Sequence, residues 1–415
     1  MLLLLVGLAL VTPQAPLRLA DLLEEARRNN PELQAAREQA RAAAAQVVPA
    51  GALDDPMLMV QLWNTPADFS TVPVMVQLSQ TFPLGGKRAA RRDAARGEAA
   101  ATQADAATKA REIEAAVAKV YFDLYLADRT LEVDRQIEAI LRSLLTSATS
   151  RMAAGKGEQA EALRAQSELL KVQSDSEGVR ARRVAASAKL VALLNRAPGS
   201  ALGMTTEPGL VENLPTQEAL RARSLRERPE FAGTQARTAQ AEARLRLAKA
   251  ERVPDLTIFL AEMHSFRMTG VSDFLFAGVQ GNLPIFAASK NRGRIETASA
   301  QRAATHAEER ALQNRIFAEI ADAYAEVTAE RRQIDLHHQL IPVARQALAS
   351  ALSAYAAGRG SFLLVLDSER DLLMHEIDLA THRAMYEQRL ADLERAVGGD
   401  LGLAQAAESG SRERH

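Results

Sequence analysis

The chain has 415 residues with 51 basic and 52 acidic side chains, and its net charge of -1 gives no case for nucleic acid as a partner. It contains no cysteine, which excludes disulfides, thiolate metal sites and cysteine nucleophiles. Aromatic residues make up only 4 %, and alanine, arginine, glutamate, glutamine and leucine dominate, which is typical of long helices that pack through small side chains.

Residues 1–15 form an apolar N-terminal segment. Its apolar run of about eleven residues is too short to span a bilayer and is typical of a signal-peptide core, although a positively charged start is missing. We expect export from this segment. No later stretch approaches eighteen uninterrupted apolar residues, which disfavours a helical inner-membrane protein.

Apolar residues recur with the period of a helix over residues 17–48. This pattern is interrupted at Asn29, Asn30 and Pro31, where we expect a second helix to begin.

Two short strand candidates follow, joined by a loop that contains proline, asparagine and aspartate. In the second candidate, Val74, Val76 and Leu78 alternate with mostly polar side chains, so one face is apolar and the other largely polar. The candidates are residues 56–63 and 74–82.

A long helical hairpin is predicted after Pro83. Residues 86–152 contain no proline and could extend roughly 100 Å at 1.5 Å per residue. A glycine-containing turn at 153–158 leads into a second helix that ends near residue 195.

The second half of the chain repeats this plan. Pro31 and Pro229 are 198 residues apart, and so are Pro56 and Pro254. Such ordered offsets indicate a duplication. The apolar side chains of the second strand pair are Leu256, Ile258 and Leu260 and, later, Phe274, Phe276, Ala277 and Val279.

The repeat predicts the division of the chain. The expected parts are a signal peptide at 1–15, a first repeat at 16–213 with its β-hairpin at 56–82, a second repeat at 214–400 with its β-hairpin at 254–283, and a polar C-terminal tail at 401–415.

Four half-apolar strands suit the wall of a lipid-facing barrel, but four strands cannot close one. An open sheet edge in a membrane leaves backbone groups unpaired at several kcal/mol each. If these strands meet lipid, several copies of the chain must therefore combine them.

The duplicated plan, the strand exits FPLGGKR and LPIFAASKNR and the paired glycine turns resemble the TolC-like outer-membrane efflux family over residues 17–400. The stretches DPMLMVQLWN and LSQTFPLGGKR look closest to its heavy-metal efflux branch. The resemblance implies a mainly α fold with a small β part: a homotrimer with one twelve-stranded outer-membrane β-barrel and a long periplasmic α-barrel. It also implies a passive exit channel for metal ions or drugs, with outer-membrane lipid, a periplasmic adaptor and an inner-membrane efflux pump as partners.

Three groups of site residues follow. Pro83 and Pro284 suit the junction of barrel and helices, because proline cannot donate to a strand ladder and tolerates a helix's first turn. By resemblance, Asp367 and Asp371 line the closed end of the tunnel, against the alternative of a plain exposed face, and Leu364 stands where relatives often have another acidic residue. By resemblance too, the adaptor docks on the turns that hold Gly155, Lys156, Gly157, Gly358, Arg359 and Gly360.

A basic cluster follows the first junction, where the positive end of the helix dipole disfavours cations. The cluster faces one of three environments: lipid headgroups, a charged tunnel mouth or solvent. The cluster is Lys87, Arg88, Arg91, Arg92 and Arg96.

The histidines predict no metal site within one chain, and rings of single histidines across the trimer stay an open alternative. His337 and His338 are adjacent and point to different sides, while His375 and His382 are two turns apart, about 10 Å, too far to share one ion. No catalytic or cofactor motif appears, so we expect no enzyme and no cofactor. The alternatives to a channel are a periplasmic adaptor, with one hairpin and soluble β domains, and a structural coiled coil without a pore.

Overall fold

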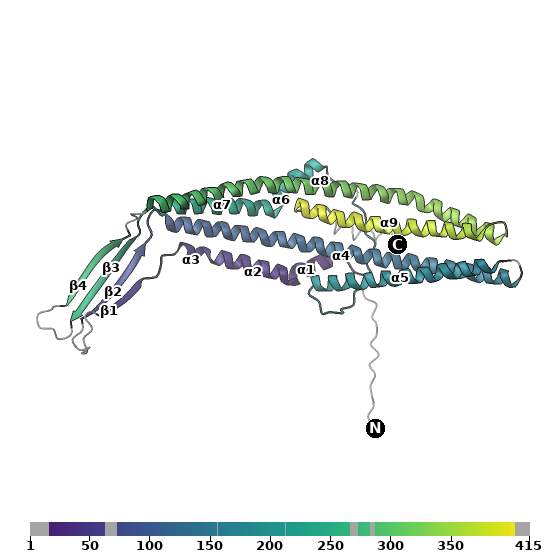
Figure 1. The fold of residues 1–415 in the computed structure, drawn as a ribbon, viewed down its shortest axis with the longest axis horizontal. Helices are drawn as coiled ribbons and strands as arrows, with labels where there is room; N and C mark the ends of the chain where they lie inside the picture. Colours follow the sequence, from purple (N-terminus) through teal and green to yellow (C-terminus); the bar gives the residue numbers. More distant parts are fainter. Residues whose placement is uncertain are drawn as a thin grey trace, which may run out of the picture. The chain divides into compact units, whose positions relative to one another are not determined.

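The computed structural model of the chain describes residues 16–62, 73–155, 157–211, 213–265, 273–282 and 287–402. The predicted signal peptide, most of the C-terminal tail, Lys156 and Pro284 lie outside these ranges. In the described part, long helices dominate and four strands form one antiparallel sheet (Figure 1). None of the described helices is both long and apolar enough to cross a membrane.

The first predicted helical segment forms α1 (Leu19–Asn29), α2 (Pro31–Ala45) and the short α3 (Val47–Gly51). Asn30 stands between the first two, and its Oδ1 accepts a hydrogen bond from the backbone N of Leu33 at 3.1 Å. Its Nδ2 donates to the backbone oxygen of Leu193 at 2.9 Å. A capping asparagine followed by proline at the first helical position is a typical helix start. The expected second helix is confirmed.

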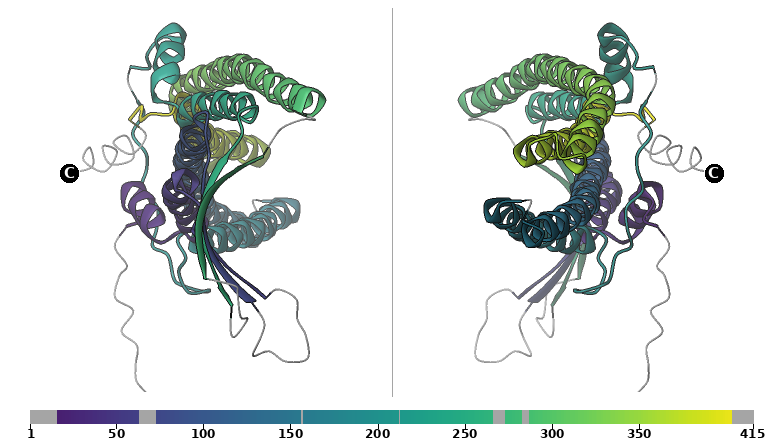
Figure 2. Two further views of the ribbon diagram at one scale, coloured as in Figure 1. Left: turned by 90° about the vertical axis from the view of Figure 1, so that its left-hand side faces the viewer. Right: turned by 90° about the vertical axis from the view of Figure 1, so that its right-hand side faces the viewer.

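The strands pair in chain order, and each is antiparallel to the next (Figure 1). The central pair joins the two halves of the sequence, because Val74 lies opposite His264 and Phe82 opposite Leu256. The outer strands, β1 and β4, pair on one side only within the described chain. Figure 2 shows that the four strands twist together. The strands are β1 (Met57–Leu62), β2 (Pro73–Phe82), β3 (Leu256–Ser265) and β4 (Phe274–Gly281).

One face of the sheet is mainly aliphatic, and we call it the aliphatic face, although it also carries Glu262 and His264 near the end of β3 and Gln80 near the end of β2. Alternation along each strand and the register between strands bring branched apolar side chains of all four strands to this face, and most of them are exposed. The other face is mixed, with methionine, glutamine, serine and threonine side chains. The exposed members of the aliphatic face are Leu58, Val60, Leu62, Val76, Leu78, Ile258, Leu260, Leu275 and Val279.

Phe274 and Phe276 lie on the mixed face, opposite to Val279, although all three belong to the same apolar run of the sequence. The ring of Phe276 meets that of Phe259 edge-on, with centroids 6.3 Å apart. Phe259 also covers Gly278, where an added Cβ would lie 2.3 Å from its ring. Phe259 and Phe276 therefore pack on each other on the mixed face, whereas Phe82, opposite Leu256, belongs to the aliphatic face.

The two long helical hairpins are present close to their predicted ranges. α4 has 67 residues and α8 has 70, so at 1.5 Å per residue each is roughly 100 Å long. Pro342 lies inside α8 without ending it. The helices of this part are α4 (Lys87–Ala153), α5 (Gln159–Leu193), α6 (Gln217–Glu227), α7 (Pro229–Ala250), α8 (Ala287–Ala356) and α9 (Phe362–Val397).

The chain divides into two compact units, and each of them draws on both halves of the sequence. The first consists of Met1–Gln34, Lys109–Arg228 and Arg315–His415, and the second of Ala35–Thr108 and Pro229–Asn314. The sheet belongs to the second unit. The order of elements is alike in both sequence halves, and the predicted repeats at 16–213 and 214–400 stay a prediction.

The core of the first unit lies between the two hairpins. Aliphatic side chains of α4, α5, α8 and α9 form it, and alanines among them permit close approach of the helices. Both hairpins curve along their length (Figure 2). Its buried members include Ile137, Leu141, Ala148, Ala165, Val172, Leu348, Ala351, Val365 and Leu366.

Candidate functional site

The passage from β2 into α4 combines a proline with two glycines. β2 ends at Phe82, so Pro83 follows the ladder directly. The helix begins only at Lys87, which leaves Pro83 outside its first turn. Gly85 and Gly86 have φ of +71° and +80°, the left-handed region that favours glycine. The proline therefore ends the strand, and the glycines turn the chain.

The first residue of the basic cluster is buried and paired. Nζ of Lys87 donates to the backbone oxygen of Val253 at 2.6 Å and lies 2.7 Å from Oδ1 of Asp255. Arg88 donates to the backbone oxygen of Gly51 at 2.9 Å. These partners offset the unfavourable helix dipole. The three other arginines of the cluster are exposed.

Glycines end both long helices at the predicted tip turns. Gly155 after α4 and Gly358 after α8 have φ of +68° and +70°. Gly360 is packed so closely that an added Cβ would lie 2.7 Å from the backbone N of Tyr355. The other described members of these turns are Gly157 and Arg359.

Tyr355 joins the two tip turns. Nη1 of Arg151 donates to its backbone oxygen at 2.9 Å, and the same guanidinium lies over its ring, with Cζ 4.6 Å from the centroid. The hydroxyl of Tyr355 donates to Oε2 of Glu161 at 3.0 Å. Its ring meets Phe362 with centroids 5.6 Å apart. The side chain of Tyr355, at the end of α8, thus contacts the end of α4 and the starts of α5 and α9.

Asp367 and Asp371 lie one turn apart on α9, and both are exposed. The side chain of Asp367 is 56 % exposed, and Nη1 of Arg370 is 4.0 Å from its Oδ1. Both predicted alternatives, a tunnel lining and a plain surface, need this exposure. The role of the two aspartates stays a prediction.

Glu369, between these two aspartates, is buried. It is 2 % exposed, and its Oε1 has no hydrogen-bond partner. Burial, and next the carboxylate of Glu168, raise the pKa of Glu369 to about 7. The sequence analysis missed this residue, because a glutamate within the charged run LDSERD has no local signal of burial.

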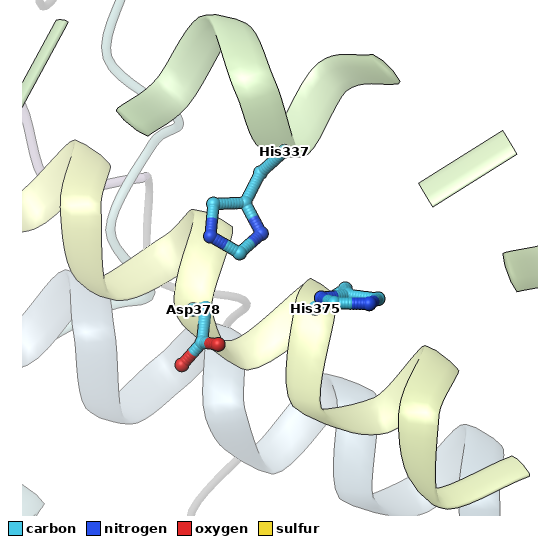
Figure 3. Close-up of side chains that lie close together, drawn as sticks. All are labelled: His337, His375 and Asp378. Atoms are coloured by element: carbon cyan, nitrogen blue, oxygen red, sulfur yellow. The ribbon is translucent and has the colours of Figure 1, made fainter. Parts of the chain in front are cut away.

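Two histidines and an aspartate come together between α8 and α9 (Figure 3). His337, His375 and Asp378 each have one metal-ligating atom within 4.8 Å of those of the other two. His337 is 7 % exposed, and burial, followed by the neighbouring His382, lowers its pKa. The lowered pKa favours a neutral imidazole, the form that binds metals. The sequence analysis missed this group, because it compared spacings only along each helix.

Comparison with known proteins gives concordant results. The outer membrane efflux protein family matches residues 22–196 and 220–399. The cobalt-zinc-cadmium resistance protein CzcC of Cupriavidus metallidurans is 26 % identical over 388 residues, 92 % of this chain and 90 % of that protein. The pyoverdine export outer membrane protein OpmQ of Pseudomonas putida is 26 % identical over 92 % of this chain and 86 % of that protein. A solved structure of CusC matches with a TM-score of 0.81 and 20 % identity, over 94 % of this chain and 96 % of that chain.

Proposed function

Because this chain belongs to the outer membrane efflux protein family, we propose that it is the outer-membrane channel of a tripartite efflux system. It lies in the outer membrane and extends into the periplasm. An inner-membrane pump and a periplasmic adaptor deliver the solute, which then leaves the cell passively through the channel. This role needs no catalysis by the chain itself.

The aliphatic face of the sheet is the observation that carries the proposal. It exposes nine large aliphatic side chains on one side of four strands. Transfer of such surface out of water is favourable by about 25 cal/mol per Å², so this face suits lipid. The unpaired edges of β1 and β4 do not suit lipid, because their backbone groups lack partners there. Three copies, with β4 of one protomer beside β1 of the next, remove every edge in a twelve-stranded barrel.

Metal cations are the solutes that we favour over drugs. CzcC, whose name refers to cobalt, zinc and cadmium resistance, is similar to this chain over nine-tenths of both lengths. The heavy-metal branch is also the one that the strand sequences resemble.

The site residues take their roles from this arrangement. The surface around Tyr355, with the tip glycines, receives the adaptor. Asp367 and Asp371 line the closed end of the tunnel in the trimer. Pro83 and Pro284 mark the junction of the barrel with the helices.

The alternatives fit less well. A periplasmic adaptor or a pore-free coiled coil does not account for four strands with an exposed aliphatic face. The family match over both halves of the chain also favours the channel.

Gene deletion tests the proposal. We expect the deletion strain to lose tolerance to Zn²⁺, Co²⁺ or Cd²⁺ while its tolerance to hydrophobic drugs is unchanged, and we expect a plasmid-borne copy to restore growth. Membrane fractionation should recover the protein as a heat-resistant trimer in the outer membrane. Unchanged metal tolerance would overturn the choice of solute, and a soluble or inner-membrane pool would overturn the channel.

A further inference from the structure

We propose that His337, His375 and Asp378 form a binding site for a divalent transition-metal ion such as Zn²⁺ or Co²⁺, held within one protomer between α8 and α9. The site is assigned from the chain's own side chains. It does not depend on which solute the channel carries.

The three side chains are arranged as ligands of one ion. His375 and Asp378 are three residues apart on α9 and so share a face of that helix, while His337 reaches toward them from α8 (Figure 3). An acidic residue and a histidine at this spacing are a known way of building metal sites between helices. Ligand atoms around a tetrahedral Zn²⁺ lie roughly 3.4 Å apart, so the observed separations of up to 4.8 Å close with modest side-chain rotation.

The imidazoles have unused nitrogen atoms. Nδ1 of His337 and Nδ1 of His375 are both buried without a hydrogen-bond partner, and His337 as a whole is 7 % exposed. Buried polar atoms normally have partners, so two such nitrogens in one cluster indicate a missing ligand. A metal ion supplies that partner to both rings at once.

The donor set selects the class of metal. Two imidazole nitrogens and one carboxylate oxygen suit Zn²⁺ and its transition-metal neighbours, whereas Mg²⁺ and Ca²⁺ prefer oxygen ligands alone. Three protein ligands leave one coordination position open, so the ion can exchange with solution.

A second layer supports the site. The ring of His382 lies 5.3 Å from that of His337, centroid to centroid, and its Nδ1 is 2.7 Å from Oε2 of Glu330. A carboxylate on one ring nitrogen fixes the orientation of an imidazole. His382 thus belongs to the surroundings of the ion.

Titration with Co²⁺ tests the proposal on the purified full chain in detergent, without added histidines and after metal removal. Visible absorption of four-coordinate Co²⁺ reports the site, and elemental analysis gives its stoichiometry. We expect one ion per chain, displaced by Zn²⁺. His375→Gln and Asp378→Asn should each weaken binding about tenfold or more.

His306→Gln is the matched control, because His306 also lies on α8 but its side chain is 51 % exposed. It should bind Co²⁺ like the wild type. Circular dichroism and trimer content establish that each variant is folded. If the His375→Gln variant does not fold, the milder Asp378→Asn variant alone tests the site. Absence of binding by the wild type would overturn the site, and so would equal affinity in folded ligand variants or a loss caused by His306→Gln.

Discussion

Glu369 and the two aspartates beside it carry the same carboxyl group but differ strongly in burial. The aspartates are exposed, whereas Glu369 is buried beside Glu168. A raised pKa means that the folded chain binds a proton on Glu369 more tightly than the unfolded chain does. The resulting stability is fully present below pH 4.5 and is lost as the pH rises to about 7.

Glu369→Gln should remove this pH dependence. We expect the variant to gain stability relative to the wild type as the pH rises from 4.5 to 7, by at most about 3 kcal/mol. Thermal melting at several pH values measures the difference. Asp371→Asn is the control, since it makes the same change on an exposed side chain two residues away. A melting difference for Glu369→Gln that is constant with pH would contradict the argument.

Gly360→Ala should damage the tip. The added Cβ meets the backbone of Tyr355 and Ala354, which cannot rotate away, so the turn has to move at a cost of about 1–3 kcal/mol. We expect reduced efflux-dependent growth at a normal outer-membrane level of the protein. Gly178→Ala in α5 has open space around its Cβ and should be neutral or gain up to about 1 kcal/mol. Equal growth of the two strains would speak against a packed tip turn.

The two faces of the sheet should respond differently to an added charge. Leu260→Arg puts a charge on the aliphatic face, and an arginine that faces lipid near the bilayer centre costs about 2–4 kcal/mol. Gln77→Arg makes the same addition on the mixed face, which we place toward the lumen. We therefore expect Leu260→Arg alone to lower the amount of folded trimer in outer-membrane fractions, measured on unheated gels. An equal loss in both variants would contradict the assignment of the faces.

At the scale of the helices, one ion pair between elements far apart in the sequence holds the start of α4. Lys87, at its first turn, reaches Asp255 just before β3. The side chain of Lys87 is 5 % exposed, and that of Asp255 is 30 % exposed. Removing one partner of a buried pair leaves the other charge uncompensated, so the pair joins the β2–α4 passage to the start of β3.

The whole molecule, as proposed, is completed only by neighbouring protomers. Within one chain, β1 and β4 are separated by two strands, roughly 14 Å at about 4.8 Å per strand. In the proposed barrel they become neighbours across the protomer boundary. The chain has no natural cysteine, so introduced cysteines are the only thiols.

Cysteine cross-linking therefore tests the trimer. Phe276→Cys in β4 is combined in turn with Met57→Cys, Met59→Cys and Gln61→Cys in β1, and a short bis-maleimide reagent is added to membranes. We expect a ladder on denaturing gels that ends at the trimer for at least one pair. A variant with one introduced cysteine can link only two protomers, so its ladder should stop at the dimer. A ladder that continues past the trimer, or monomers alone for every pair, would contradict a closed trimer.

The sequence by itself determined the elements. Alternation at Val74, Val76 and Leu78, the proline after each strand pair and the glycines after each long helix are local signals, because strand faces, ladder ends and left-handed turns depend on a few adjacent residues. They also sufficed for the family resemblance. The tertiary structure decided which distant side chains meet: His337 with His375, Lys87 with Asp255, and the burial of Glu369. These depend on how one helix or strand packs against another far along the chain, and no spacing within a single element encodes that.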